Sequence, residues 1–155
     1  MVQFKPVFEI TYVNPELMQS LFFFTIGIVV TFFILRSFPK PLSNRIISFV
    51  WIVGWNAYCV LGVAGAFKAT HQYCQKLRAG AAEVIEGQVE VLHREPVTGH
   101  DAGDRIRING KEFTYSFFSG KVTYHQTISH GGKLDNGVYA RLYAYKGEIL
   151  KAEVR

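Results

Sequence analysis

The sequence predicts an α+β membrane protein, with a two-helix transmembrane hairpin followed by a small antiparallel β-barrel of the OB-like or SH3-like kind. Two uncharged apolar runs, 17–35 and 46–67, are each about 20 residues long, enough to cross a hydrocarbon core of about 30 Å as helices. From residue 83 onward apolar and polar side chains alternate, and turn residues separate five or six short strands. Such strands close most naturally into a barrel, because closure removes exposed edges.

This pattern divides the chain into four regions. In residues 1–16 five apolar side chains fall on even positions, which favours a strand, and Pro6 restricts it to an edge strand; they are Val2, Phe4, Phe8, Ile10 and Tyr12. Residues 17–67 are the transmembrane helical hairpin. Residues 68–82 are polar and continue the second helix as a juxtamembrane helix or linker, and residues 83–155 are the β-barrel domain.

The second apolar run carries the residues expected to hold the helices together. Asn56 is its one strongly polar side chain, and it indicates either a polar path or an interhelical hydrogen bond. Gly62, Gly65 and Ala66 give the helix a face of small residues. We expect this face to pack against the first helix or against a second copy of the chain.

The positive charge is concentrated near the predicted membrane. The chain has a net charge of +5, and residues 1–82 hold seven basic and two acidic side chains, whereas residues 83–155 hold ten of each. Anionic lipid head groups attract basic residues beside a membrane span. A nucleic-acid-binding domain would carry the excess on its own surface, so the predicted partners are the lipid bilayer and a protein or a second copy, without nucleic acid.

The clearest local pattern in the second half is a hairpin. Asn109-Gly110 lies between two alternating segments, as a type I′ turn requires, and this register places Ile106 opposite Phe113. Alternation also predicts a strand at 122–128, and further strands follow toward the end of the chain.

Short motifs are spread over residues 83–155. They are Val84-Ile85-Glu86-Gly87-Gln88-Val89, Gly99-His100, Asn109-Gly110-Lys111-Glu112-Phe113-Thr114-Tyr115-Ser116, Ser129-His130-Gly131-Gly132, Gly137-Val138-Tyr139-Ala140-Arg141 and Ile149-Leu150. With these motifs the region resembles a group of uncharacterised small bacterial membrane proteins, which carry two membrane helices ahead of a small β-barrel (OB-like) domain. The resemblance implies a bacterial envelope protein, and it brings no catalytic residue with it.

Two loops hold the residues that suggest chemistry. A metal site can be drawn from His100, Asp101 and His130 if loops 94–103 and 129–137 meet. Their spacing does not require one, since Asp and His are also common in turns, and we predict neither a metal nor a cofactor.

A hydrolytic set is the other chemical alternative at these loops. It would combine Ser116 or Ser129 with His125 or His130 and an aspartate. The sequence contains no nucleophile elbow, and a domain of about 70 residues leaves little room for a substrate cleft. We therefore predict no catalytic residues.

An aromatic surface is the binding site that the sequence favours. Tyr139, Arg141 and Tyr143 share one face of an alternating segment, together with many other aromatic side chains in this region. Aromatic residues and arginine are enriched where proteins bind partners. The alternative is that they pair across strands and stabilise the sheet.

The sequence therefore predicts a membrane-anchored, non-enzymatic binding or interaction protein, and a toxin-immunity protein is one specific form of it. The loop 36–45 holds three basic residues, which places it in the cytoplasm of a two-pass protein of the bacterial inner (cytoplasmic) membrane. The barrel would then lie outside the cytoplasm. Lys68, Lys76 and Arg78 favour the opposite orientation, so the side of the membrane stays open.

Overall fold

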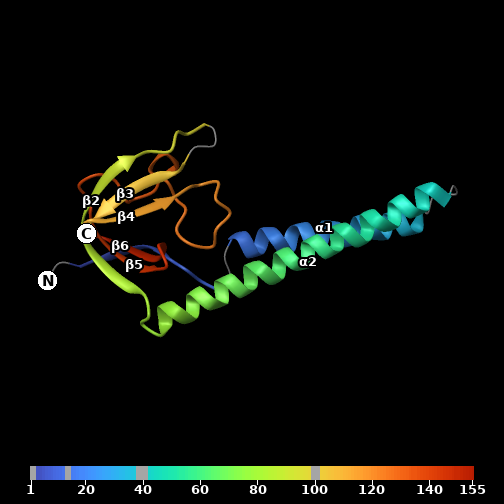
Figure 1. Cartoon of the computed structure of the whole chain (residues 1–155), viewed down its shortest axis with the longest axis horizontal. Coiled ribbons are helices and arrows are strands. Elements are labelled where there is room, and N and C mark those ends of the chain that lie inside the picture. Colours follow the sequence, from blue (N-terminus) through green and yellow to red (C-terminus); the bar gives the residue numbers. More distant parts are fainter. Residues whose placement is uncertain (1–2, 13–14, 38–41, 99–101) are drawn as a thin grey trace. The chain divides into compact units, whose positions relative to one another are not determined.

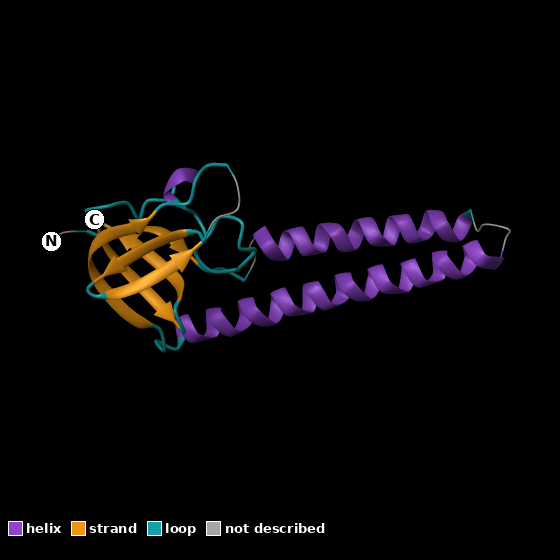
Figure 2. Ribbon diagram, turned by 45° about the horizontal axis from the view of Figure 1, so that its top comes forward, coloured by secondary structure: helices purple, strands orange, loops and turns teal. Residues whose placement is uncertain are grey.

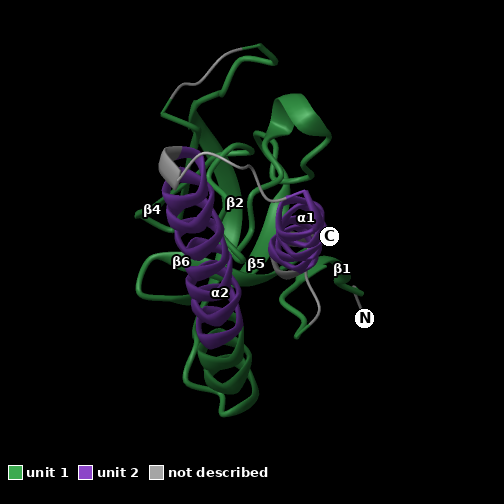
Figure 3. Ribbon diagram, turned by 90° about the vertical axis from the view of Figure 1, so that its right-hand side faces the viewer, with its two compact units in different colours: residues 1–12, 70–155 green, residues 13–69 purple. Residues whose placement is uncertain are grey.

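The computed structural model of the chain describes residues 3–12, 15–37, 42–98 and 102–155. Their elements are, in order, β1 (Lys5–Glu9), α1 (Pro15–Arg36), α2 (Leu42–Arg78), β2 (Glu83–His93), β3 (Asp104–Ile108), β4 (Lys111–Tyr115), the 3₁₀ helix η1 (Ile128–His130), β5 (Tyr139–Tyr145) and β6 (Glu148–Val154) (Figure 1). They form two compact units (Figure 3). We call Met1–Tyr12 with Thr70–Arg155 the sheet unit and Val13–Ala69 the helical unit.

The two helices are long and apolar enough to cross a membrane, as predicted. The qualifying segments are Met18–Arg36 and Asn44–Arg78, and an 18-residue apolar window within each has a mean hydropathy of 2.2 and 1.8, respectively. Only 6% of each apolar window is buried, whereas the core helix of a water-soluble protein would be mostly buried. The helix α2 has 37 residues, about 55 Å at 1.5 Å per residue, so it continues well past its apolar run.

Asn56 and Gly27 mark places where α1 and α2 contact each other in the helical unit. The Asn56 side-chain amide donates hydrogen bonds to Thr31 Oγ1 at 3.0 Å and to the Ile52 carbonyl at 2.8 Å. This agrees with an interhelical hydrogen bond at Asn56. Gly27 of α1 lies against Trp55, where an added Cβ would be 2.5 Å from the indole Nε1.

The small-residue face makes no close contact with α1 at its glycines, although Gly62 lines a pocket with Gln19, Ser20 and Phe23 of α1, so its packing within the helix pair stays a prediction. A Cβ added at Gly62 or Gly65 would meet no atom of the described residues within 4 Å, and both glycines are exposed. Ala66 is half-buried. The indole of Trp55 instead occupies the close-approach position, at Gly27, so packing of the small face across a dimer stays a prediction.

The six strands form one antiparallel sheet in the order β1-β6-β5-β2-β3-β4. The predicted hairpin has the predicted register, with Ile106 opposite Phe113. Asn109 and Gly110 adopt φ angles of 49° and 79°, the positive values that a type I′ turn requires. The predicted edge strand near the N-terminus is β1, which pairs only with β6 among the described strands.

The sheet is strongly curved but does not close into the barrel that we expected (Figure 2). Its edges, β1 and β4, do not pair with each other. The gap is covered by the ring of Tyr124, which packs edge-on against Phe8 of β1 at 5.4 Å and Tyr115 of β4 at 4.9 Å between centroids. A side chain therefore closes the core where a barrel would use backbone hydrogen bonds.

The segment that supplies Tyr124 is not the strand predicted at 122–128. Its alternation is real, because Val122 and Tyr124 are buried, but it makes one backbone hydrogen bond to the sheet, from Tyr124 N to Ile149 O at 3.0 Å. The Thr127 carbonyl accepts the amides of His130 and Gly132, which curls the chain into η1. Alternation here marks burial under a loop rather than a strand.

The core of the sheet unit lies on the concave face of the sheet. Alternate residues of β5 point into it, and Ala140 and Leu142 are fully buried. They pack with Ile106, Ile108 and Leu134, which are also fully buried. The other residues of β5 point to the opposite, outer face of the sheet, where the predicted aromatic surface lies.

Candidate functional site

The two loops that could hold a metal or hydrolytic site do meet. The Ser129 hydroxyl donates to the Glu95 carbonyl at 2.6 Å, and the Arg94 guanidinium bridges Asp135 at 2.5 Å. The contact satisfies the geometric condition for a shared site. His100 and Asp101 lie outside the described residues, so the structure leaves their part in it open.

Two buried carboxylates, Glu95 and Asp104, organise the place where these loops meet. Glu95 accepts hydrogen bonds from the Ser116 hydroxyl at 2.5 Å and the Phe117 amide at 2.9 Å. Asp104 accepts from the Glu95 amide at 2.7 Å and the Ile128 amide at 2.6 Å. Each of the four carboxylate oxygens thus accepts a hydrogen bond, three from backbone amides and one from a hydroxyl. Buried acids that are fully hydrogen-bonded in this way stabilise the structure around them.

His130 is held away from both candidate nucleophiles. Its Nδ1 lies 2.7 Å from Thr127 Oγ1, and its ring stacks on Phe117 with centroids 4.0 Å apart. The hydroxyls of Ser116 and Ser129 bond to Glu95 instead. A nucleophile activated by histidine needs a direct hydrogen bond between the two, whereas His130 and these two serines each bond to other groups among the described residues.

The described residues contain no group of three histidine, cysteine, aspartate or glutamate side chains arranged to hold a metal ion. Glu95 was not singled out in the sequence, because nothing distinguishes it there from a surface glutamate. Its burial becomes visible only when the loops are folded.

The predicted aromatic surface is present on the outward face of β5, and its members are bonded to one another. Arg141 pairs with Glu86 of β2 at 2.8 Å, and its guanidinium lies 4.0 Å from the ring centroid of Phe4. The hydrogen bond that Arg141 donates to Glu86 raises the pKa of its guanidinium. Tyr139 lies under Arg155, and the Tyr143 hydroxyl donates to Glu153 at 3.4 Å. These contacts favour cross-strand stabilisation by Tyr139, Arg141 and Tyr143.

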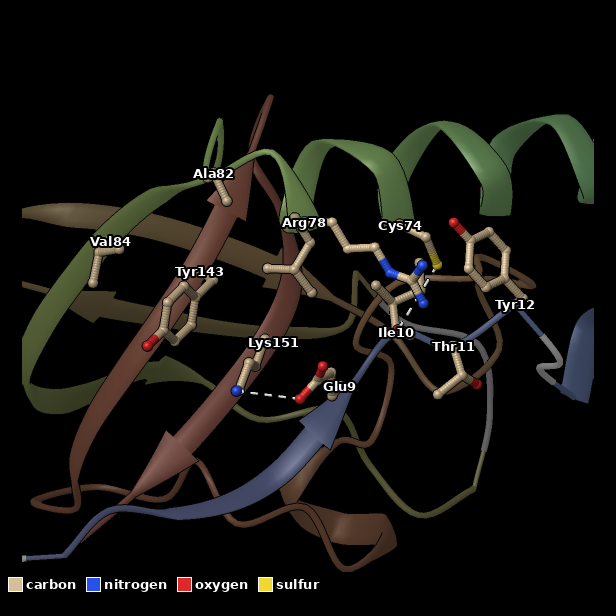
Figure 4. Close-up of a pocket in the computed structure, with 12 residues that line it drawn as sticks. Glu9, Ile10, Thr11, Tyr12, Cys74, Arg78, Ala82, Val84, Tyr143 and Lys151 are labelled. Atoms are coloured by element: carbon tan, nitrogen blue, oxygen red, sulfur yellow. Dashed lines mark hydrogen bonds and ion pairs between the residues drawn. The ribbon is translucent and has the colours of Figure 1, made fainter.

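A pocket of about 430 Å³ lies beside this surface, between the last turns of α2 and the outer face of the sheet (Figure 4). All of its lining residues belong to the sheet unit. They are Glu9, Ile10, Thr11, Tyr12, Cys74, Leu77, Arg78, Gly80, Ala82, Val84, Tyr143 and Lys151. Most of the lining is apolar or aromatic. The charged lining residues are the ion pair of Glu9 with Lys151 and, apart from it, Arg78.

The two cations of the pocket differ in their partners. Lys151 bridges Glu9 at 3.2 Å and Glu153 at 3.1 Å, and the hydrogen bond to Glu153 is the largest cause that raises its pKa. The guanidinium of Arg78 lies 4.8 Å from the ring centroid of Tyr12, and no carboxylate of the described residues is within ion-pair distance of it. Figure 4 shows Arg78 reaching from the helix toward Tyr12 and Cys74.

Sequence reasoning missed this pocket because its walls come from four separate parts of the chain. The basic residues after the second apolar run were noted only as membrane-surface charges. The available signal was Tyr12 at the end of an alternating segment, since β1 brings it to the last turns of α2.

Comparison with known proteins adds no relative: no family model, no curated protein and no solved structure matches the chain.

Proposed function

We propose that this chain is a membrane-anchored, non-enzymatic binding protein of the bacterial envelope, whose sheet unit contacts a protein or ligand at the membrane. The observation that carries the proposal is the exposure of the two apolar helices, whose apolar windows are each only 6% buried, on a chain that also folds a well-packed sheet unit. Helices of this length and exposure suit a lipid environment. The resemblance of residues 83–155 to small bacterial envelope proteins supports the same role.

Binding is favoured over hydrolysis by the hydrogen bonds around Glu95. The hydroxyls of Ser116 and Ser129 both donate hydrogen bonds to that residue, and His130 is hydrogen-bonded to Thr127. The open pocket beside Arg78 offers a surface that a ligand can enter. An immunity protein against a membrane-acting toxin is one specific form of such a binding role.

Affinity purification tests the binding role directly. The tagged full chain is extracted from membranes in mild detergent, and co-purified proteins and small molecules are identified by mass spectrometry. We expect the chain to resist carbonate extraction of the membranes and to retain at least one molecule in stoichiometric amount. Turnover of a substrate with nothing retained would contradict the proposal.

A metal-dependent or hydrolytic site at loops 94–103 and 129–137 is the second candidate, and the contact of these loops through Ser129 and Arg94 supports it. The variants His100→Ala and His130→Ala test it. If metal content and cellular phenotype are unchanged in both, this candidate is excluded.

The proposed orientation places the sheet unit outside the cytoplasm, because the loop 36–45 is basic. Cys74 is only 3% exposed and cannot report the topology by labelling. We therefore suggest Ser119→Cys, at an exposed position, in a Cys59→Ala, Cys74→Ala background. A membrane-impermeant thiol reagent should label it in intact spheroplasts, and labelling only after lysis would place the sheet unit in the cytoplasm.

A further inference from the structure

The pocket beside Arg78 has the size and lining of a small-molecule site. Its volume of about 430 Å³ falls within the range of about 300–1,000 Å³ typical of ligand pockets. Apolar walls come from Ile10, Leu77 and Val84, and Val84 is 54% exposed at the rim. A ligand with an apolar body would cover this surface.

The charge of the pocket selects the sign of the ligand. Lys151 is neutralised by Glu9 and Glu153, which leaves Arg78 as the cation without a carboxylate partner among the described lining residues. A guanidinium presents a planar fork of N–H donors that matches a carboxylate or a phosphate ester. The contact with Tyr12 covers one face of the guanidinium and leaves its donors without an acidic acceptor.

We propose that this pocket binds an anionic amphiphile, whose carboxylate or phosphate head group pairs with Arg78 while its short apolar body lies on Ile10, Leu77 and Val84. The proposal deepens the binding role proposed above and rests on it. Two sources supply this chemistry: an anionic phospholipid at the membrane and a free organic acid.

The position of Arg78 has a simpler explanation that the experiment must separate. A basic residue in the last turn of a helix offsets the partial negative charge of the helix C-terminus. That role needs charge only, and its loss would lower stability without a change in selectivity among ligands. The test therefore measures ligand affinity and thermal stability in the same variants.

The experiment uses the full chain in a nonionic detergent and four probes: dihexanoyl phosphatidylglycerol, dihexanoyl phosphatidylcholine, hexanoate and inorganic phosphate. The variants are Arg78→Gln and Arg105→Gln, which remove the same charge, Arg105 being an exposed residue of β3. Affinities are measured by calorimetry, and unfolding temperatures are recorded for each variant.

We expect phosphatidylglycerol or hexanoate to bind, and Arg78→Gln to weaken that binding by about tenfold or more, the loss of one charge-assisted contact. Arg105→Gln should bind as the parent does. Phosphatidylglycerol binding that exceeds phosphatidylcholine binding identifies a lipid head group, and hexanoate binding alone identifies a soluble acid.

Three results would overturn the proposal. They are equal weakening by both substitutions, inorganic phosphate binding as tightly as the amphiphiles, and no binding of any probe. None of these results would contradict the proposed binding function, because affinity purification of the chain tests for a protein partner independently.

Discussion

The helical unit and the sheet unit place the same kinds of side chain in opposite ways. Phe22 and Leu61 in the helices are 62% and 72% exposed, whereas Ile106 and Leu142 in the sheet unit are fully buried. Water drives apolar side chains into a core, but lipid tails solvate them as well as a neighbouring helix does. The sheet unit therefore buries its large apolar side chains, whereas the helical unit leaves many of its own exposed.

The units also differ in how they treat polar groups. The sheet unit buries Glu95 and Asp104 and satisfies every carboxylate oxygen from loop donors. The helical unit holds Asn56, which bonds across to Thr31. A hydrogen-bonded polar group fixes one specific approach in each unit: buried carboxylates fix that of two loops in the sheet unit, and the half-buried Asn56 fixes that of two helices in the helical unit.

The comparison of apolar residues is tested most strongly by truncating a leucine in each unit. Leu142→Ala should cost the sheet unit about 2–5 kcal/mol, because it removes buried methyl groups and leaves a cavity. Leu61→Ala should have almost no effect on the sheet unit. Hydrogen exchange of β3 and β4 in the full chain measures both, and equal effects would mean that the stability of the sheet unit depends on Leu61 as much as on its own core.

The buried carboxylate is tested by Glu95→Gln. The amide group of glutamine cannot accept both hydrogen bonds that Glu95 receives from Ser116 and Phe117, so we expect a loss of about 1.5–3 kcal/mol in the free energy of unfolding. Glu90→Gln is the matched control, because Glu90 is an exposed partner of Arg107 and such pairs contribute about 0–1 kcal/mol. A control that lost as much as Glu95→Gln would refute the structural role of Glu95.

The helix contact is tested by adding one methyl group to each of two glycines. Gly27→Ala should destabilise the helix pair by about 1–3 kcal/mol, because its Cβ would lie 2.5 Å from Trp55 Nε1. Gly62→Ala should be tolerated, since the described residues leave open space around it. Both tryptophans of the chain lie in α2, so their fluorescence during detergent unfolding reports on this unit alone. A loss only at Gly62 would place the small face in a dimer contact.

The sequence was most informative where a local pattern determines local structure. Two apolar runs predicted α1 and α2, and Asn109-Gly110 predicted the β3–β4 turn and its register. The predicted strand at 122–128 was wrong, because alternation reports which side chains are buried and does not show whether the backbone pairs with a strand. With that strand replaced by a loop, the barrel could not close.

The candidate sites were harder to predict because they depend on contacts between distant segments. Tyr139, Arg141 and Tyr143 were found on one outward face as predicted, but Glu86, Glu153 and Phe4, which hold them, come from other strands or from the N-terminal segment. Arg78 and Tyr12 are separated by two helices in the sequence, and only the fold brings them together.

The smallest expected effect concerns Tyr124, which closes the core between β1 and β4. Burial raises the pKa of Tyr124 to about 12, against a smaller lowering from the backbone amides of Lys133 and Leu134. Burial raises the pKa of Tyr115 as well. The amides of Lys133 and Leu134 lie near the Tyr124 hydroxyl without meeting hydrogen-bond geometry, so neither tyrosine hydroxyl has a hydrogen-bond partner among the described residues. The sheet unit therefore keeps the neutral form of both tyrosines.

Stability should fall as the pH rises above about 10, because the unfolded chain then releases tyrosine protons that the folded chain retains. The loss from Tyr124 extends through its folded pKa of about 12 and should reach about 1 kcal/mol at pH 11. Tyr124→Phe removes this titrating group and one unpartnered hydroxyl, so it should make the pH dependence between pH 10 and 12 less steep while leaving stability at pH 7 unchanged or slightly higher. Tyr115 and Lys151, whose pKa values are also raised, add slopes of the same sign that remain in the variant. Thermal unfolding of the full chain and of Tyr124→Phe across this range measures the difference, and parallel curves would show that the Tyr124 hydroxyl is solvated in the folded protein.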